Sequence, residues 1–372
     1  MSKELDELRL ELDTIDRELM AVAARRMRVV RGIGALKAGN TRAVFDRQRE
    51  RAVFARARRN AEAAGLPSEV GERLLHTLVE AGHGMQTQAA AGKMSEPRKV
   101  LILGGLGAMG RLLGDTLALR GHHIDAYDRD DPRDLAQTIA QVDVVLIAVP
   151  MALAAKVARL VCPMMRSGQL LCDINSLKEE VCGIFETECK SEALGLHPMF
   201  GPSVGSLRRQ KVVVCHVHDG PQSEWLVSEF GRLGTDIIET DARTHDRMMA
   251  VVQVLVHFHT IVMGEALRRT EVPVADSLRF TSPIYRLELA VVGRLFTQDA
   301  ELYASIEMDN PHGSEMRQLF LDAAQALHEA IESGDRARFT EMFSGVTAYF
   351  DDFGPEAMRV SDAIIDMLVE RA

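Results

Sequence analysis

The chain has 372 residues, of which 47% are hydrophobic and 26% are charged, so it is long enough for two or three domains and has a globular composition. Its formal net charge of −10 argues against nucleic acid as the main partner. No apolar run approaches the roughly eighteen residues of a membrane helix, and charge begins at Lys3. We therefore predict no signal peptide, no membrane span and a cytoplasmic location. The five cysteines never form a CxxC pair, which predicts reduced thiols and no metal site.

The N-terminal segment carries a heptad pattern typical of a long helix that packs against other helices. Apolar residues recur at alternating spacings of three and four, skip one position and then resume: Leu5, Leu8, Leu12, Ile15, Leu19, Val22, Val29, Ile33 and Leu36. A helix of about 45 Å cannot cover such a stripe by itself. Two further helices are predicted over 45–64 and 68–88, separated by Gly65-Leu66-Pro67. Three helices of unequal length make a poor monomeric core, so we expect an intertwined dimer.

The position that the heptad series skips is occupied by Arg26. A guanidinium in a helix seam is strongly destabilising unless it is neutralised. Acidic partners are scarce, because no Asp or Glu lies between Glu18 and Asp46. Either a more distant carboxylate side chain or an anionic ligand must pair with Arg26, and the local sequence favours the ligand.

With Arg26 in that position, the segment resembles the all-helical chorismate mutases that are fused to other enzymes of aromatic biosynthesis. The resemblance rests on seven polar positions at the family's spacing: Arg9, Arg26, Lys37, Asp46, Arg49, Glu50 and Gln86. It implies that the three arginines bind the carboxylates of chorismate, with Arg9 reaching into the partner's site. It implies that Lys37 and Gln86 donate to the ether oxygen, and that Asp46 and Glu50 hold the substrate hydroxyl. A non-catalytic dimerisation or effector-binding module is the alternative.

Residues 91–97 are predicted to be a linker, and beyond them strand-like and helical segments alternate, as in a doubly wound α/β sheet. The predicted strands are 99–103, 123–127, 143–149, 169–174, 194–197, 211–216 and 235–240. From Thr244 onward strand signals stop and the pattern is helical. We therefore predict an all-α domain over 1–90, a Rossmann-like NAD-binding domain over 98–243, and an all-α substrate-binding and dimerisation domain over 244–372.

The first of these strands runs into a glycine-rich turn and then a helix, which is the context that a dinucleotide-binding fingerprint needs. The turn is Gly105-Leu106-Gly107-Ala108-Met109-Gly110. We expect Gly105 to permit the tight turn, Gly107 to let the backbone approach a pyrophosphate, and Gly110 to let helix and strand pack closely. Asp128 ends the second strand, where a carboxylate can accept hydrogen bonds from an adenosine ribose; it favours NAD, although Arg129 follows it. A glycine turn without a nucleotide is the alternative.

Three loops follow later strands and are expected to meet at the carboxyl edge of the sheet. They are Val149-Pro150, the segment 173–178 and the segment 196–202. The first is expected to line the cofactor site. In the third, His197 ends a strand and two prolines follow it, which holds the imidazole stiffly near the position of a nicotinamide.

The motifs His197-Pro-Met-Phe-Gly-Pro202 and Asp173-Ile-Asn-Ser-Leu-Lys178, together with residues 282–296, resemble those of prephenate dehydrogenases. With the mutase-like segment, the chain is similar over nearly its whole length to the bifunctional chorismate mutase/prephenate dehydrogenase family of tyrosine biosynthesis. The resemblance implies NAD-dependent oxidative decarboxylation of prephenate to 4-hydroxyphenylpyruvate.

The resemblance also implies roles for single side chains. His197 would accept a hydrogen bond from the C4 hydroxyl of prephenate, and Ser176 would hold the imidazole. Arg294 would bind the ring carboxylate. The residues expected to line the same pocket are Arg286, Lys178 and His245.

Feedback inhibition by tyrosine and a homodimer are further implications, with His257 and Tyr303 at positions linked to the response to tyrosine. From the residues alone, His257 lies within an apolar helical pattern, and effector and core roles are equally open. A dehydrogenase that prefers arogenate would use the same fold and is the alternative for the second reaction.

Overall fold

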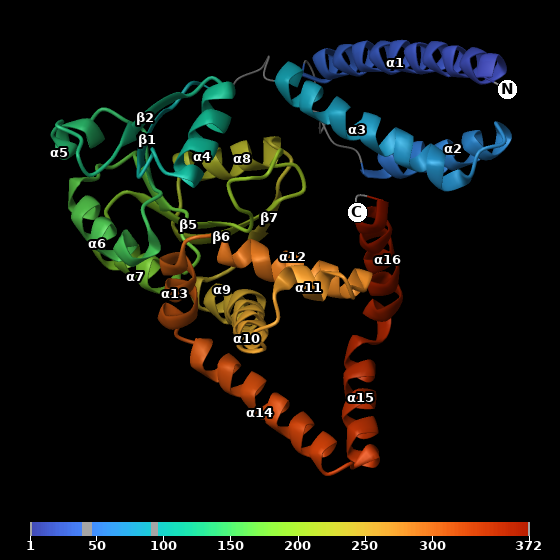
Figure 1. The fold of residues 1–372 in the computed structure, drawn as a ribbon. Helices are drawn as coiled ribbons and strands as arrows, with labels where there is room; N and C mark the ends of the chain where they lie inside the picture. The colour runs from blue at the N-terminus through green and yellow to red at the C-terminus, as the bar shows by residue number, and fades with distance from the viewer. Residues whose placement is uncertain (1, 39–46, 91–95, 371–372) are drawn as a thin grey trace. The chain divides into compact units, whose positions relative to one another are not determined.

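The computed structural model describes residues 2–38, 47–90 and 96–370, with side chains for 5–33, 52–79, 81–82 and 96–368. It begins with three helices, α1 (Ser2–Ala38), α2 (Arg47–Ala63) and α3 (Ser68–Ala90), as predicted (Figure 1). Helix α3 packs against both α1 and α2. A Cβ added to Gly71 would lie 2.5 Å from the Cβ of Ala61, so α2 and α3 approach each other closely because these side chains are small or absent.

The heptad seam of α1 lies on the surface of the chain. Leu8 is 58% exposed and Val22 is 65% exposed, and the other described seam residues are exposed as well. Apolar surface left in water is unfavourable by about 25 cal/mol per Å² relative to buried surface. An intertwined dimer would bury this stripe, and the intertwining stays a prediction.

Residues 99–239 contain a seven-stranded sheet in the order β2-β1-β3-β4-β5-β6-β7. The strands are β1 (Lys99–Leu103), β2 (His123–Tyr127), β3 (Val144–Ile147), β4 (Leu170–Asp173), β5 (Glu192–Pro198), β6 (Lys211–His218) and β7 (Asp236–Glu239). Neighbours are parallel except β5 and β6. The predicted Rossmann-like sheet is confirmed. The antiparallel pair arises because no helix forms between β5 and β6, and a parallel neighbour needs a longer crossover.

Helices connect most of the strands: α4 (Ala108–Leu119), α5 (Leu135–Ile139), α6 (Met151–Val161), α7 (Glu179–Glu188) and α8 (Pro221–Arg232). Leu113 of α4 and Trp225 and Phe230 of α8 share one buried cluster with alternate residues of the strands, such as Leu146 and Leu196. This cluster is the core on one face of the sheet (Figure 1). It holds the strand ends, and hence the loops that follow them, in fixed order.

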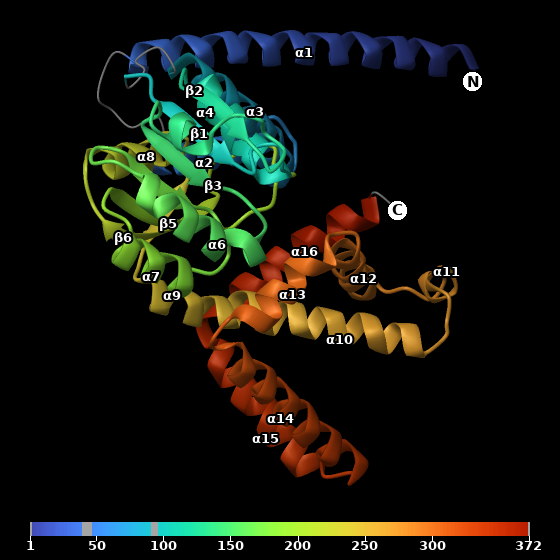
Figure 2. The same cartoon turned by 90° about the vertical axis from the view of Figure 1, so that its left-hand side faces the viewer.

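From Ala242 to Glu370 the chain is helical, as predicted. The elements are α9 (Ala242–Met249), the π-helical turn η2 (Ala250–Leu255), α10 (Val256–Arg269), α11 (Val274–Leu278), α12 (Pro283–Phe296), α13 (Ala300–Asp309), α14 (Gly313–Glu332), α15 (Arg336–Phe350), the 3₁₀ turn η3 (Asp351–Phe353) and α16 (Gly354–Glu370). Helix α10 packs against α12, and α14 lies beside α15 (Figure 2). This compact unit also contains Pro150–Ala155 and Asn175–Gly183, which follow β3 and β4. Pro150 and residues 175–178, which are parts of two of the three predicted site loops, therefore belong to the helical unit.

One helical run in the described residues, Ala242–Arg269, is long and apolar enough to cross a membrane by length and composition. The core helix of a helical domain has the same length and composition, so a single such run is weak support for a membrane span. The buried His245 and Asp246 at its start are held by hydrogen bonds within the helical unit.

Candidate active sites

The glycine-rich turn after β1 has the geometry of a dinucleotide-binding loop. Its left-handed residue is Gly104, with φ +81°, and a Cβ there would lie 2.6 Å from the carbonyl oxygen of Ala148. Position 105, where we expected the tight turn, requires glycine for a different reason. A Cβ there would lie 2.7 Å from the Cβ of Ala126 in β2. A Cβ on Gly110 would lie 2.5 Å from the Gly104 oxygen, so the start of α4 packs on the loop as predicted.

The outer side of this loop is open to a ligand. Leu106, Gly107 and Ala108 are exposed, and Gly107 precedes α4, whose first N–H groups can bind an anion. Asp128 follows β2 and accepts the N–H of Leu106 at 2.9 Å, which places the predicted ribose-binding carboxylate at the rim of the loop. These residues fit a dinucleotide.

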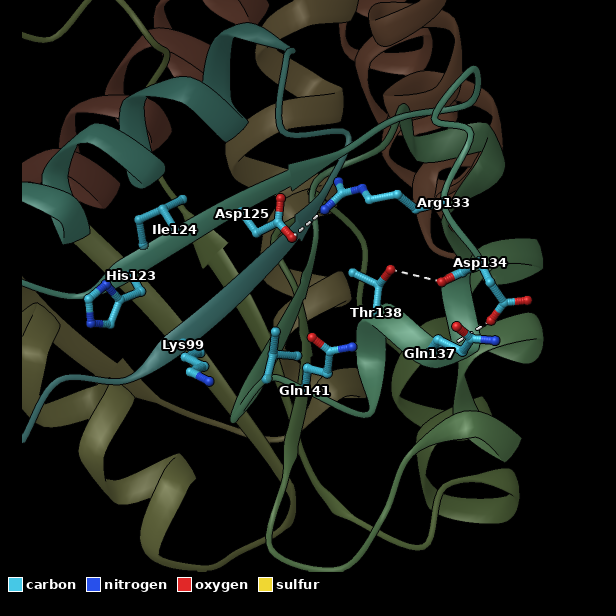
Figure 3. A pocket seen from close by; sticks show the side chains of 10 residues that line it. Lys99, His123, Ile124, Asp125, Arg133, Asp134, Gln137, Thr138 and Gln141 are labelled. Atoms are coloured by element: carbon cyan, nitrogen blue, oxygen red, sulfur yellow. Dashed lines mark hydrogen bonds and ion pairs between the residues drawn. The ribbon is translucent and has the colours of Figure 1, made fainter.

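Arg133 fixes the turn that follows Asp128. Its guanidinium donates to both oxygens of Asp131, at 2.9 and 2.7 Å, and to Asp125 of β2 at 2.6 Å (Figure 3). The pKa of Asp131 falls to about 2 because Arg133 hydrogen-bonds its charged form. A guanidinium held by two carboxylates is poorly placed to bind a 2′-phosphate, which agrees with NAD.

Arg133 also lines a polar groove of about 450 Å³, and Figure 3 shows the side chains around it. Lys99 and His123, which line it, are the first residues of β1 and β2. The glycine loop and Asp128 follow the last residues of the same strands. The groove thus lies at the opposite edge of the sheet and is no part of the cofactor site.

The predicted catalytic histidine lies inside a strand. His197 is the penultimate residue of β5, is buried, and pairs in register with Val213 of β6. Val149 lies against the glycine loop, since its nitrogen would be 3.0 Å from a Cβ on Gly104. Ser176 and Pro150 belong to the helical unit. The contact of Ser176 with the imidazole therefore stays a prediction.

Within the helical unit, Asp246 joins two predicted site residues, although the sequence did not predict a role for it. Asp246, 1% exposed, accepts the N–H of Lys178 at 2.9 Å and the N–H of Glu179 at 2.8 Å. Its other close contact is with Nδ1 of His245, at 2.6 Å. Lys178 is itself fully buried. The only sequence signal for Asp246 is its position next to His245.

A pocket of about 670 Å³ opens beside Asp246, lined by Asn175, Leu177, Glu179, Asp309 and Pro311 among others. The loop that bears Asp309 and Pro311 joins α13 to α14, in a region where the sequence analysis gave no function. Its closeness to the 175–179 segment explains why it belongs to the site region.

Helix α12 carries both predicted substrate arginines, Arg286 and Arg294. Burial raises the pKa of the Tyr303 phenol, and the positive charge of Arg294 partly offsets that rise. The Tyr303 ring meets the His257 ring edge-on, with centroids 5.0 Å apart. The structure thus brings together Arg294 and the two predicted effector residues, and burial lowers the pKa of His257.

One turn beyond Tyr303, Glu307 is buried without hydrogen bonds to its carboxyl oxygens in the described residues. The nearest positive charge is Arg317, with NH1 3.8 Å from Oε2. Desolvation raises the pKa of Glu307 to about 7, and Arg317 opposes that rise only in part. No local pattern in the sequence marks this residue, because its burial depends on the packing of α13 against distant helices.

Only part of the predicted mutase site lies within the described side chains. Arg26 is half-buried, donates to the carbonyl oxygen of Leu78 at 2.8 Å, and has a pKa lowered by burial. Within the described residues, no carboxylate pairs with it. Arg9 is exposed and pairs with Asp6 on the same helix. For four predicted residues the structure describes the helical backbone but not the side chain: Lys37, Arg49, Glu50 and Gln86. Asp46 lies outside the described residues.

The Arg26 guanidinium lines a pocket of about 410 Å³ between α2 and α3. Arg56 and Asn60 also line it, and its other walls are apolar, such as Val53 and Leu74. A positive group in such walls fits an anionic ligand with a hydrophobic body.

Three family models match separate parts of the chain. "Chorismate mutase type II" matches residues 8–87, "Prephenate dehydrogenase, nucleotide-binding domain" matches 115–229, and "Prephenate dehydrogenase, dimerization domain" matches 241–345. The first range covers most of α1–α3, and the third begins at the residue before α9.

The chain is also similar to whole proteins. It is 33% identical to the T-protein of Haemophilus influenzae, over 97% of this chain and 96% of that protein. It is 32% identical to the T-protein of Enterobacter agglomerans, over 95% and 94% respectively. The solved prephenate dehydrogenase from A. aeolicus, in complex with hydroxyphenyl propionate and NAD+, matches with a TM-score of 0.56 and 16% identity, over 70% of this chain and 100% of that chain. At that identity, the likeness indicates the fold alone.

The contact of Gly110 with the glycine loop predicts the effect of one methyl group. In Gly110→Ala, the Cβ must push α4 away from Gly104, so the KM for NAD+ should rise by about tenfold, which corresponds to 1.4 kcal/mol of binding. Gly231→Ala in α8 is the matched control, because a Cβ there meets nothing within 4 Å. Equal KM values in the two variants would contradict the packing argument.

The buried Glu307 predicts a pH-dependent gain in stability on neutralisation. A carboxyl with a raised pKa favours the folded state when protonated, so this contribution is full below pH 4.5 and is lost as pH rises to about 7. Glu307→Gln should therefore stabilise the helical unit at pH 8 by up to about 3 kcal/mol and leave it nearly unchanged at pH 4.5. Urea unfolding at both values measures this, with the exposed Glu341→Gln as control. The same stability difference at both pH values would refute the desolvation argument.

Proposed function

The chain belongs to the T-protein family of bifunctional chorismate mutase/prephenate dehydrogenases, and from that premise we propose which residues carry each reaction. It is an isomerase that converts chorismate to prephenate and an NAD-dependent oxidoreductase that converts prephenate to 4-hydroxyphenylpyruvate in tyrosine biosynthesis. The observation that carries this conclusion is the match of one mutase and two dehydrogenase family models in a single chain. We assign the mutase to 1–90, a linker to 91–97, the NAD-binding domain to 98–243 and the substrate-binding domain to 244–372.

The mutase reaction is a rearrangement of a dianion that needs no nucleophile and no proton transfer. Its catalyst must hold a compact conformer and stabilise negative charge on the ether oxygen. Arg9, Arg26 and Arg49 would bind the carboxylates. The half-buried Arg26, which has no carboxylate partner in the described residues, supports that role.

The ether oxygen and the hydroxyl of chorismate need further partners. We assign the donors to the ether oxygen as Lys37 and Gln86, since a cation and an amide N–H can both stabilise developing negative charge there. Asp46 and Glu50 would accept from the substrate hydroxyl. Arg9 would act in the partner's site, which agrees with its exposed position on α1.

In the dehydrogenase reaction, hydride leaves C4 of prephenate as its hydroxyl becomes a carbonyl, and loss of CO₂ makes the ring aromatic. NAD+, held by the glycine-rich turn and Asp128, would supply the hydride acceptor. His197 accepts the hydrogen bond of the C4 hydroxyl, holds its proton while the hydride leaves and returns it to the same oxygen as loss of CO₂ makes the ring aromatic, and Ser176 orients the imidazole. Arg294 binds the ring carboxylate, with Arg286, Lys178 and His245 around the same substrate.

Regulation by tyrosine is part of the proposal. Tyrosine resembles the aromatic product, and the His257–Tyr303 ring pair lies where the Arg294 charge acts on Tyr303. A ligand ring bound beside this pair would compete with prephenate for the same cation. We place the protein in the cytoplasm as a homodimer, with the dimerization-domain match over 241–345 as the support for the dimer.

One assay tests both activities. Full-length protein with chorismate and NAD+ should produce NADH, and prephenate with NAD+ should do so faster, since one step is bypassed. NADH from prephenate but not from chorismate would favour a non-catalytic helical module. Faster turnover of arogenate than of prephenate would instead identify an arogenate-preferring dehydrogenase.

Two substitutions should separate the activities within one chain. Lys37→Ala removes a donor to the ether oxygen and should lower mutase turnover by at least about 10²–10³-fold, with prephenate oxidation unchanged. His197→Asn should lower prephenate oxidation by about 10²–10⁴-fold, with mutase turnover unchanged. Each variant is the folding control for the other. Retained mutase turnover in Lys37→Ala would remove that assignment.

If His257 belongs to the effector site, its substitution should remove the inhibition by tyrosine. His257→Ala should remain a dehydrogenase but lose most of its inhibition by tyrosine, measured as the concentration that halves NADH production. His259→Ala is the control. His259 lies on the same helix as His257, α10, but its ring lies beside Phe320 of α14, with ring centroids 6.0 Å apart. Full inhibition in His257→Ala would exclude this residue from the effector site.

A further inference from the structure

A buried carboxylate in the helical unit connects three segments that are distant in sequence. We propose that Asp246 is the positioning residue of the prephenate side of the dehydrogenase, because it fixes both His245 and the loop that carries Ser176 and Lys178. The proposal rests on the roles assigned to those residues above. Asp246 itself need not touch the substrate.

The buried carboxylate of Asp246 is satisfied by hydrogen bonds from within the protein. Asp246 is 1% exposed, and such a group is tolerated only when its oxygens receive hydrogen bonds. Three nitrogens point to its two oxygens: Nδ1 of His245 and the N–H of Lys178 at Oδ1, and the N–H of Glu179 at Oδ2. An ionised carboxylate is only an acceptor, so all three nitrogens must carry the hydrogens.

This requirement fixes the proton on the histidine. The Nδ1 of His245 lies 2.6 Å from Asp246 and must donate, so in the neutral ring Nε2 is the nitrogen with the lone pair. A carboxylate that orients an imidazole in this way sets which of the two ring nitrogens carries the proton.

The same carboxylate fixes the start of α7. The amides of Lys178 and Glu179 are N–H groups at that helix terminus, which have no partner within the helix. Asp246 accepts them from another helix, so the cap ties the 175–178 loop to α9. Because Ser176 lies within this loop, its position depends on Asp246.

A closed circuit of hydrogen bonds makes the arrangement rigid. Asp246 accepts from the amide of Glu179, and the Glu179 carboxylate lies 2.8 Å from Nε2 of His312. The amide of His312 donates to the side-chain oxygen of Asn310 at 2.8 Å, and Asn310 donates to the backbone oxygen of Asp246 at 3.0 Å. These hydrogen bonds attach the α13–α14 loop to α7 and α9, beside the pocket lined by Asn175 and Leu177.

The test uses Asp246→Asn in the full-length protein. An amide has one accepting oxygen for three N–H groups, so His245 must exchange its Nδ1 proton for an Nε2 proton or turn away. The kcat for prephenate oxidation should fall by about 10–100-fold, the effect typical of a residue that orients another. The KM for NAD+ and the mutase turnover should not change. Nitrogen NMR of labelled histidine should show the exchange of the His245 proton.

Asp362→Asn is the control. It removes the same charge from an exposed position on α16, in the same helical unit but outside the lining of the pocket beside Asp246, so its kcat should stay within about twofold of wild type. In the His245→Asn background, Asp246→Asn should lower kcat by less than in the wild type, because part of its action passes through that histidine.

If Asp246→Asn fails to fold, as loss of the urea unfolding transition of the helical unit would show, His312→Gln opens the circuit at its solvent side and should lower kcat by a smaller factor while that transition is retained. Wild-type kcat in the folded Asp246→Asn protein, or additive effects in the double variant, would overturn the proposal. A wild-type chain that fails to oxidise prephenate would instead refute the proposed function.

Discussion

Parallel strands end on the same side of a sheet, and this constraint gathers the dehydrogenase residues. The chain leaves β1 into the glycine loop and leaves β2 at Asp128, while Val149 follows β3 and His197 lies at the end of β5. Hydrogen-bond register, rather than closeness in sequence, therefore brings nucleotide-binding and catalytic groups to one edge. The core cluster shared by α4 and α8 maintains that register from one face of the sheet.

Two buried carboxylates in the helical unit compensate for their loss of hydration in opposite ways, one by hydrogen bonds and the other by a raised pKa. Asp246 receives hydrogen bonds from three nitrogens and serves as a fixed anchor. Glu307 receives none in the described residues, and its pKa rises to about 7. The difference lies in the donors around each group, since both are buried. The first arrangement orders neighbouring segments, whereas the second makes stability depend on pH.

The sequence alone predicted those features of the fold and of the site that depend on a short stretch of residues. Buried strands appear as short apolar runs, and the strand–glycine–helix pattern with Asp128 has a fixed spacing, so both were predictable. The Asp246 circuit was not, because its partners Glu179 and Asn310 are 67 and 64 residues away and are polar residues of ordinary type. Nor could the sequence distinguish Gly104 from Gly105 as the left-handed residue, since only the approach of Ala148 and Ala126 separates them.

Uncovered apolar surface on two separate modules constrains how the dimer is built. The α1 seam is exposed, and so are Phe343 and Tyr349 of α15, at the end of the dimerization-domain match over 241–345 and just beyond it. In a closed dimer each interface is related to itself by a two-fold axis. If the two modules paired with different chains, each chain would have two partners and the assembly would be larger than a dimer, either closed, as in a tetramer, or open. A homodimer therefore requires that the mutase and dehydrogenase interfaces join the same two chains.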